Sequence, residues 1–162
     1  MLKQLKELLE MQRLLDESIF RKKGILEYPE ENMKIALFVE LGELMNELPT
    51  YFKHWKSTSI DNRDKALIEF VDCLHFALSL TNHKYNRDFL EMKIKEYEYD
   101  SYYTTMLSKL PISDLILHQM KFKGDLLSLF ALGNKFGFEW NEIYETYLNK
   151  NAVNYERLNG GY

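Results

Sequence analysis

Residues 30–47 read EENMKIALFVELGELMNE, and residues 61–81 read DNRDKALIEFVDCLHFALSLT. Apolar residues recur in both stretches at spacings of three and four, which is the pattern of an amphipathic helix. The first stretch follows Pro29 and stops before Pro49, and prolines mark helix boundaries. We therefore predict one helix over 30–47 and another over 61–81.

Each of these two helices carries a pair of carboxylates three residues apart, so each pair shares one helix face. Glu40 and Glu43 form the first pair, and Glu69 and Asp72 form the second. Apolar neighbours surround both pairs, and an unpaired charge among apolar groups is costly. Four such carboxylates facing one another across two antiparallel helices would make a hard-oxygen site for Mg²⁺ or Mn²⁺. The alternative is a solvated charge face, because glutamate is common on helix surfaces.

A di-iron site of the ferritin type is the other metal site that these helices suggest. It needs Glu-x-x-His pairs from two helices. Only Asp72-Cys73-Leu74-His75 has this shape, and it carries Asp in place of Glu. We interpret His75 as a supporting group rather than a metal ligand, and Cys73 as a small core residue rather than a nucleophile.

The rest of the chain continues the helical pattern. Seven Gly and three Pro in 162 residues are too few turn-forming residues for a sandwich or barrel. No linker-like run or internal repeat is visible. The predicted fold is all-α, a single domain over residues 1–162, built as a multi-helix bundle with a four-helix core that carries the metal site. Helical segments are predicted at 3–22, 30–47, 61–81, 84–110, 112–135 and 139–157.

Charge and cysteine content exclude several classes of function. The chain has 21 Lys and Arg against 25 Asp and Glu, a net charge of −4 that provides no general basic surface for nucleic acid. A single cysteine cannot form an intramolecular disulfide, and no stretch approaches the ~20 apolar residues of a membrane span. We expect a cytoplasmic protein with neither a nucleic-acid nor a membrane partner.

Two basic stretches point to phosphate. Lys150, Asn154 and Arg157 lie on one stripe of the last predicted helix, and their cationic and amide groups can bind phosphate oxygens. The alternative is an exposed last turn in which Lys and Arg favour the helix dipole. Trp55 and Lys56 form either a basic lid with a stacking aromatic ring or an amphipathic turn with Trp55 in the core.

Taken together, these residues resemble the dimeric, all-α dUTPase family within the all-α nucleotide pyrophosphohydrolase superfamily, over nearly the whole chain. Glu-x-x-Glu followed by Glu-x-x-Asp is typical of the superfamily, which includes MazG-like enzymes and deoxycytidine triphosphatases. The series near the C-terminus narrows the resemblance to dUTPase. The matching pieces are Met11-Gln12 with Asp16, Glu40 to Glu47, Trp55-Lys56, Glu69 to Asp72, Leu74-His75-Phe76, Lys150-Asn151, Asn154, Arg157 and Gly161-Tyr162.

The resemblance implies a magnesium enzyme. Glu40, Glu43, Glu69 and Asp72 would hold the catalytic Mg²⁺, with Mn²⁺ as a substitute. Glu43 is expected to be the base that activates water for attack on the phosphate chain, and Glu47 is its rival. Phosphoryl transfer depends on charge neutralisation and positioning, which such a site provides.

The same resemblance implies dUTP and dUDP as substrates, dUMP as the nucleotide product, and a homodimer. Gln12 and Asp16 would lie in the uracil pocket, and His75 belongs with the substrate-binding residues. Asp16 departs from the family pattern because Asn is expected there, and Leu158 follows Arg157 where Gln is usual. The sugar and phosphates would be enclosed by Trp55, Lys56, Lys150, Asn154 and Arg157.

Two other functions stay open on the sequence. One is a related pyrophosphohydrolase with a different base specificity, for dCTP or for a broad range of nucleotides. The other is a non-catalytic helical module that senses nucleotides or regulates a partner. The chain carries an acidic residue at all four predicted metal-binding positions, which favours an enzyme. The aromatic residues between 85 and 110 fit either the core or a dimer interface.

Overall fold

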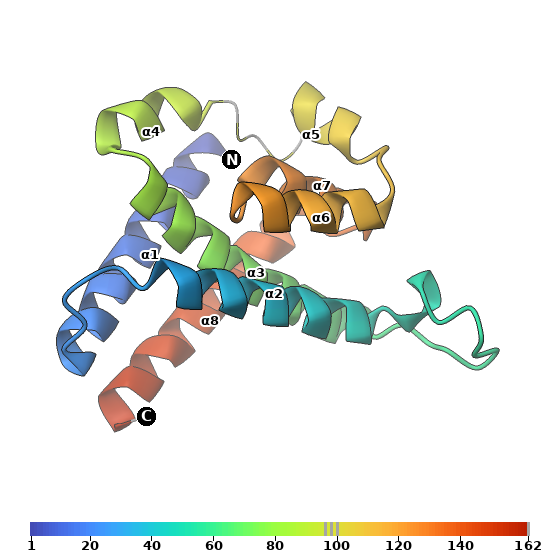
Figure 1. Cartoon of the computed structure of the whole chain (residues 1–162), viewed down its shortest axis with the longest axis horizontal. Helices are drawn as coiled ribbons and strands as arrows, with labels where there is room; N and C mark the ends of the chain where they lie inside the picture. The colour runs from blue at the N-terminus through green and yellow to red at the C-terminus, as the bar shows by residue number, and fades with distance from the viewer. Residues whose placement is uncertain (96, 98, 100, 162) are drawn as a thin grey trace.

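The computed structural model describes residues 1–95, 97, 99 and 101–161, and over these residues it is helical with no strand (Figure 1). The all-α fold is thereby confirmed. None of the described helices is both long and apolar enough to cross a lipid bilayer. The helices are α1 (Leu2–Lys23), α2 (Glu30–Glu47), the 3₁₀ helix η1 (Pro49–Tyr51), α3 (Arg63–Lys84), α4 (Arg87–Lys93), α5 (Tyr102–Leu107), α6 (Ile112–Phe122), α7 (Leu126–Lys135) and α8 (Trp140–Gly160).

Helix α3 lies at the centre of the molecule. It packs lengthwise against α2 and also contacts α1, α7 and α8. Figure 1 shows α2 running alongside α3, with α1 and the C-terminal part of α8 toward the end where α2 begins. Phe70, Leu74 and Leu78 of α3 have no exposed surface. Two polar residues of α3 meet side chains of neighbouring helices, since His75 lies against Gln12 of α1 and Asp72 against Lys150 of α8.

Helix α2 is held against α3 by a stripe of leucines. Leu37, Leu41 and Leu44 are 0%, 3% and 0% exposed. Burying a leucine side chain contributes about 1.5–3 kcal/mol, so this stripe fixes the rotation of α2. Glu40 directly precedes Leu41, and Glu43 directly precedes Leu44. Both carboxylates therefore lie at the edge of the α2–α3 contact.

The prediction of one helix over 112–135 was wrong, because the chain breaks into α6 and α7. Lys123 adopts a left-handed conformation with φ 56°, and Gly124 follows with φ 79°. Asp125 then caps α7 by accepting a 3.0 Å hydrogen bond from the backbone N–H of Ser128. Gly133 lies inside α7.

The segment predicted as helical over 84–110 is helical only in part. Helices α4 and α5 begin at the capping residues Asn86 and Ser101, and the chain between them is not a continuous helix. Residues 96, 98 and 100 lie outside the described residues. Of the aromatic side chains expected in the core or in a dimer interface, Tyr99 is buried in the core, whereas Tyr102 is 77% exposed. The interface role stays a prediction. The Tyr99 hydroxyl donates a 2.6 Å hydrogen bond to the carbonyl of Phe138.

Gly133 provides a test of how tightly α7 packs on α3. A Cβ at this position would lie 2.8 Å from Phe70 Cζ and 2.8 Å from the Tyr99 hydroxyl. A Cβ at Gly42, also in a helix, would meet no atom within 4 Å. Both Gly→Ala changes gain helix propensity, but only Gly133→Ala overpacks the core. We expect Gly133→Ala to be less stable than Gly42→Ala by about 1–3 kcal/mol in urea unfolding. Equal stabilities would mean that the core around Gly133 is loose.

Candidate catalytic site

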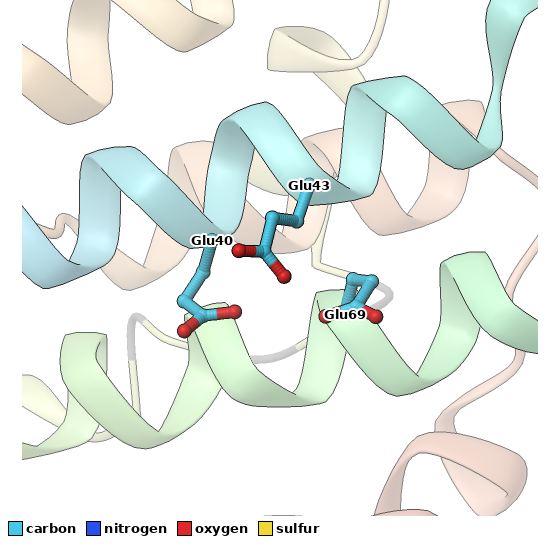
Figure 2. A group of neighbouring side chains, drawn as sticks. All are labelled: Glu40, Glu43 and Glu69. Carbon is cyan, nitrogen blue, oxygen red and sulfur yellow. The ribbon is translucent and has the colours of Figure 1, made fainter.

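Three carboxylates meet where α2 and α3 run side by side. Glu40 and Glu43 project from α2 and Glu69 from α3 toward a common space (Figure 2). One carboxylate oxygen from each of the three residues lies within 4.8 Å of the others. Glu43 is exposed, whereas Glu40 and Glu69 are half-buried. The structure thus brings together three of the four acidic residues predicted as metal ligands.

Burial and the neighbouring charges raise the pKa of two of these carboxyl groups. Burial, together with the charges of Asp72, Glu43 and Glu69, raises the pKa of Glu40 to about 7. Burial and the charge of Asp72 also raise the pKa of Glu69. A cation that binds among these groups relieves their repulsion, and carboxylate oxygens are the donors that hard divalent cations prefer. The residues present therefore fit a divalent metal ion.

The fourth acidic residue, Asp72, has a cationic partner. Lys150 of α8 donates a 2.6 Å hydrogen bond to Asp72 Oδ2, and the two side chains are only 22% and 16% exposed. Burial raises the pKa of Asp72, and the bond to Lys150 opposes that rise. Asp72 lies outside the three-carboxylate group, and its role as a metal ligand stays a prediction. Glu47 is half-buried, and its charge also contributes to the raised pKa of Glu69.

A pocket of about 270 Å³ lies between α1, α2, α3 and α8. The structure brings five of the predicted substrate-binding residues into it from three helices. The remaining lining is largely apolar, as in most small-ligand sites. The five predicted lining residues are Gln12, Asp16, His75, Asn154 and Arg157.

The amide of Gln12 is held in one orientation on the pocket wall. Its Nε2 donates a 2.7 Å hydrogen bond to Asp16 Oδ1. Its Oε1 accepts a 2.9 Å hydrogen bond from the Tyr147 hydroxyl and lies 2.7 Å from His75 Nδ1. The His75 ring also stacks on Tyr147 with ring centroids 4.1 Å apart. These contacts leave the amide no freedom to rotate without losing hydrogen bonds.

The protonation state of His75 follows from this network. Burial lowers the pKa of His75 to about 3, so the ring is neutral near pH 7. Since Gln12 Oε1 is an acceptor, His75 Nδ1 carries the ring proton and donates to it. His75 Nε2 is therefore an acceptor, and it is buried without a hydrogen-bond partner among the described residues. Such a group is costly unless a donor reaches it.

Asp16 is a carboxylate in a largely buried position. Burial raises its pKa to about 6, and hydrogen bonds from Ser79 and Gln12 oppose that rise. The family resemblance leads us to expect an asparagine at this position, and its side chain would be neutral at every pH. Asp16 therefore adds a titratable group to this pocket wall.

A comparison with known protein families identifies the family of this chain. The family model described as dUTPase matches residues 4–162, which is nearly the whole chain. The chain belongs to the dUTPase family. Its activity is the hydrolysis of dUTP, and its substrate is therefore a nucleotide. A comparison with curated proteins returns no match.

Two residues expected at the dUTPase site lie elsewhere in the chain's structure. Trp55 is 64% exposed and Lys56 is exposed as well. They belong to the loop after η1, which projects beyond the end of α2 (Figure 1) and contributes no residue to the pocket. The interpretation that places Trp55 in the core was wrong, and a lid function stays a prediction. Of the C-terminal motif, Gly161 caps α8 with φ 89°, and Tyr162 lies outside the described residues.

Sequence reasoning missed two residues of this dUTPase pocket. Tyr147 bonds to Gln12, and Ser79 lines the pocket wall. Tyr147 precedes Lys150 by three residues, so the helical stripe that predicted Lys150 and Asn154 also contains it. Ser79 follows His75 by four residues and shares its face of α3 for the same reason. Helical spacing alone was the signal that could have found both residues.

Asp16 predicts a specific pH dependence of stability. The folded chain binds the Asp16 proton more tightly than the unfolded chain, so between pH 3.8 and about 6 the free energy of unfolding falls as pH rises. A pKa raised from 3.8 to about 6 corresponds to ~3 kcal/mol. We expect Asp16→Asn to remove this loss, which urea unfolding of both proteins at pH 4 and pH 7 will measure. An identical pH dependence in the two proteins would contradict the burial of this charge.

Proposed function

We propose that the chain converts dUTP, and dUDP, to dUMP in a Mg²⁺-dependent reaction at the α2–α3 carboxylates. The observation that carries this proposal is the meeting of Glu40, Glu43 and Glu69 next to the pocket. Asp72 interacts electrostatically with both the carboxylate cluster and the pocket wall. Its charge acts on Glu40 of the cluster, and the charge of Arg157, which lines the pocket, acts on Asp72. A nucleotide whose base occupies the pocket can thus direct its phosphates toward the carboxylates.

Glu40, Glu43, Glu69 and Asp72 would hold the metal, for which Mn²⁺ is the substitute with the same preference for oxygen ligands. When bound, Mg²⁺ supplies charge neutralisation for the phosphate oxygens and makes a coordinated water more acidic. The carboxylates contribute the fixed negative charge that retains the ion.

We assign the role of general base to Glu43. It is the exposed member of the cluster, and no hydrogen bond to a described residue occupies its carboxylate. A carboxylate that is open to water can accept a proton from the attacking water as the new bond to phosphorus forms. Glu47 is the rival, since it lies one turn further along α2 and is half-buried.

The phosphate chain would be bound by the polar residues of α8. Arg157 and Asn154 line the pocket, and Lys150 lies beside Asp72. Guanidinium and ammonium groups bind phosphate oxygens with charge-assisted hydrogen bonds, which orient the chain toward the carboxylates. Trp55 and Lys56 would complete this enclosure only if the loop that carries them reaches a bound nucleotide.

Base selection would rest on His75. Uracil has an N–H at ring position 3, whereas cytosine has an acceptor nitrogen there. We propose that His75 Nε2, the buried acceptor without a partner, accepts a hydrogen bond from the N3–H of uracil. Cytosine would leave two acceptors facing each other, and a site built on a buried hydrogen bond rejects such analogues strongly. This argument favours dUTP over dCTP or a broad range of nucleotides.

The homodimer and the cytoplasmic location stay predictions. Support for a second copy comes from α2, where Ile35 and Val39 are 54% and 52% exposed one turn apart. The cluster of Glu40, Glu43 and Glu69 disfavours a non-catalytic nucleotide-sensing module, because such a module has no need of a metal-binding group.

The charge of Glu43 should be essential for turnover. Glu43→Gln keeps the size of the side chain and removes its charge. We expect kcat for Mg²⁺-dependent pyrophosphate release from dUTP to fall by about 10²–10⁴-fold, because general-base catalysis contributes this much. The matched control is Glu31→Gln at the start of the same helix, where the side chain is 76% exposed.

The control should keep wild-type activity, and both variants should keep wild-type helix content by circular dichroism. Full activity of Glu43→Gln would refute its role, and wild-type turnover in EDTA would refute the metal dependence. Loss of activity in Glu47→Gln but not in Glu43→Gln would move the base to Glu47.

His75→Leu should change base specificity. The substitution removes both ring nitrogens at similar volume, so the discrimination between uracil and cytosine should collapse. We expect the wild-type ratio of kcat/KM for dUTP over dCTP to exceed ~10³, as for other buried hydrogen-bond sites, and to fall at least tenfold in the variant.

The control is Tyr147→Phe, which removes the other hydrogen bond to Gln12 Oε1 and leaves His75 Nε2 in place. It should slow both substrates and keep their ratio. Equal wild-type rates on dUTP and dCTP would contradict the uracil assignment itself.

A further inference from the structure

A second concave site lies apart from the catalytic pocket. A groove of about 390 Å³ opens between the C-terminal ends of α3 and α6 and the first residue of α2. It shares no lining residue with the pocket of Gln12 and His75. Three lysines line it, namely Lys84, Lys121 and Lys123, and we call it the lysine groove. Its volume is that of a small-molecule site.

Two of the three lysines have no carboxylate partner. Among the described residues, the ammonium groups of Lys84 and Lys121 make no ion pair, and each lies over the aromatic ring of the next residue. The distances to the ring centroids of Tyr85 and Phe122 are 4.9 Å and 5.3 Å. Phe122 is 43% exposed and lines the groove. The Phe122 ring also packs on the ring of His118, with centroids 4.2 Å apart. The groove therefore combines uncompensated positive charge with a partly exposed aromatic side chain.

The carboxylate that lines the groove is already neutralised. Glu30 Oε1 accepts a 2.8 Å hydrogen bond from Lys123 and lies 3.0 Å from Lys34, which stands outside the groove. These two ammonium groups lower the pKa of Glu30 to about 2. The groove thus keeps a net positive charge in a chain whose overall charge is −4. Such a local field attracts anions.

The backbone conformation of Lys123 indicates that its side chain has a role in the groove. Its φ of 56° is left-handed, and every other described residue with positive φ is a glycine. Lysine at such a position is strained, and glycine would avoid the strain. The ion pair with Glu30 is exposed, and exposed pairs stabilise a fold very little. Stability therefore does not explain a lysine here, whereas an ammonium group required at the mouth of the groove does.

We propose that the lysine groove binds the phosphate groups of a small organic phosphate, with the Phe122 ring against the ligand's body. Three ammonium groups match the two to three negative charges of a diphosphate and form charge-assisted hydrogen bonds with its oxygens. A nucleoside diphosphate and inorganic pyrophosphate share this chemistry, and the aromatic face distinguishes them. This site is independent of the carboxylates and of the catalytic pocket.

Calorimetric titration with ADP and with pyrophosphate tests the proposal. The buffer contains EDTA and saturating dUMP, which keep the probes out of the catalytic site. We expect one ADP per chain with Kd below ~1 mM. The double variant Lys84→Ala/Lys121→Ala should bind ADP at least tenfold more weakly. The matched control Lys3→Ala/Lys109→Ala loses the same charge from exposed positions outside the groove and should bind like the wild type.

The outcomes separate the alternatives. ADP binding at least tenfold tighter than pyrophosphate would support an organic phosphate held by Phe122, and equal affinities would overturn the organic ligand and the role of Phe122. Wild-type protein that binds neither probe would overturn the proposal. Equal weakening in both double variants would also overturn it, because it would reveal an effect of total charge alone.

Lys123→Gly provides an independent check. Relief of the left-handed strain should raise the midpoint of thermal unfolding, while loss of the ammonium group should weaken ADP binding at least tenfold. A lower midpoint together with unchanged ADP affinity would show that Lys123 serves the fold alone, which would refute its role in the groove.

Discussion

The packing of α2 along α3 is the constraint on which the catalytic site depends. Leu37, Leu41 and Leu44 bury the inner face of α2, and the burial of three leucines contributes several kcal/mol. Glu40 and Glu43 stand beside this stripe, so the leucines determine where the carboxylates lie. Like charges so close repel one another, and this repulsion adds to burial in raising the pKa of Glu40. The apolar contact therefore holds together a polar cluster that would otherwise separate.

Helical periodicity was sufficient to predict the core elements and the acidic cluster. Helices α1, α2 and α3 begin and end within a few residues of their predicted bounds, because strong apolar periodicity marks all three and flanking Pro or Gly also marks α1 and α2. The identity of Lys123 did not predict the break between α6 and α7, because lysine has no preference for the left-handed backbone conformation that it adopts there. Gly124 followed by Asp125, a turn former and a helix cap, was the available signal.

The contacts between the pocket residues could not be predicted from the sequence. Gln12, His75 and Tyr147 belong to three helices that are far apart in sequence, and no spacing rule relates them. Their contacts determine which nitrogen of His75 carries the proton, and burial keeps the ring neutral. The same limit applies to Asp72 and Lys150, which were expected to serve metal and phosphate separately and which bind each other in the structure. Partners across helices follow from packing rather than from the pattern along one helix.

The Asp72–Lys150 pair explains how four acidic residues are tolerated in so small a region. Burial and the repulsion of neighbouring carboxylates already raise the pKa of Glu40, and a fourth unpaired carboxylate would add to that repulsion. Lys150 instead offsets the charge of Asp72. Both side chains are mostly buried, so breaking the pair without a replacement would be costly. A divalent cation and a phosphate chain are such replacements, since the cation attracts Asp72 and the phosphate attracts Lys150. In the proposed reaction, Asp72 and Lys150 would each exchange the other for a new partner, and neither charge would be left uncompensated.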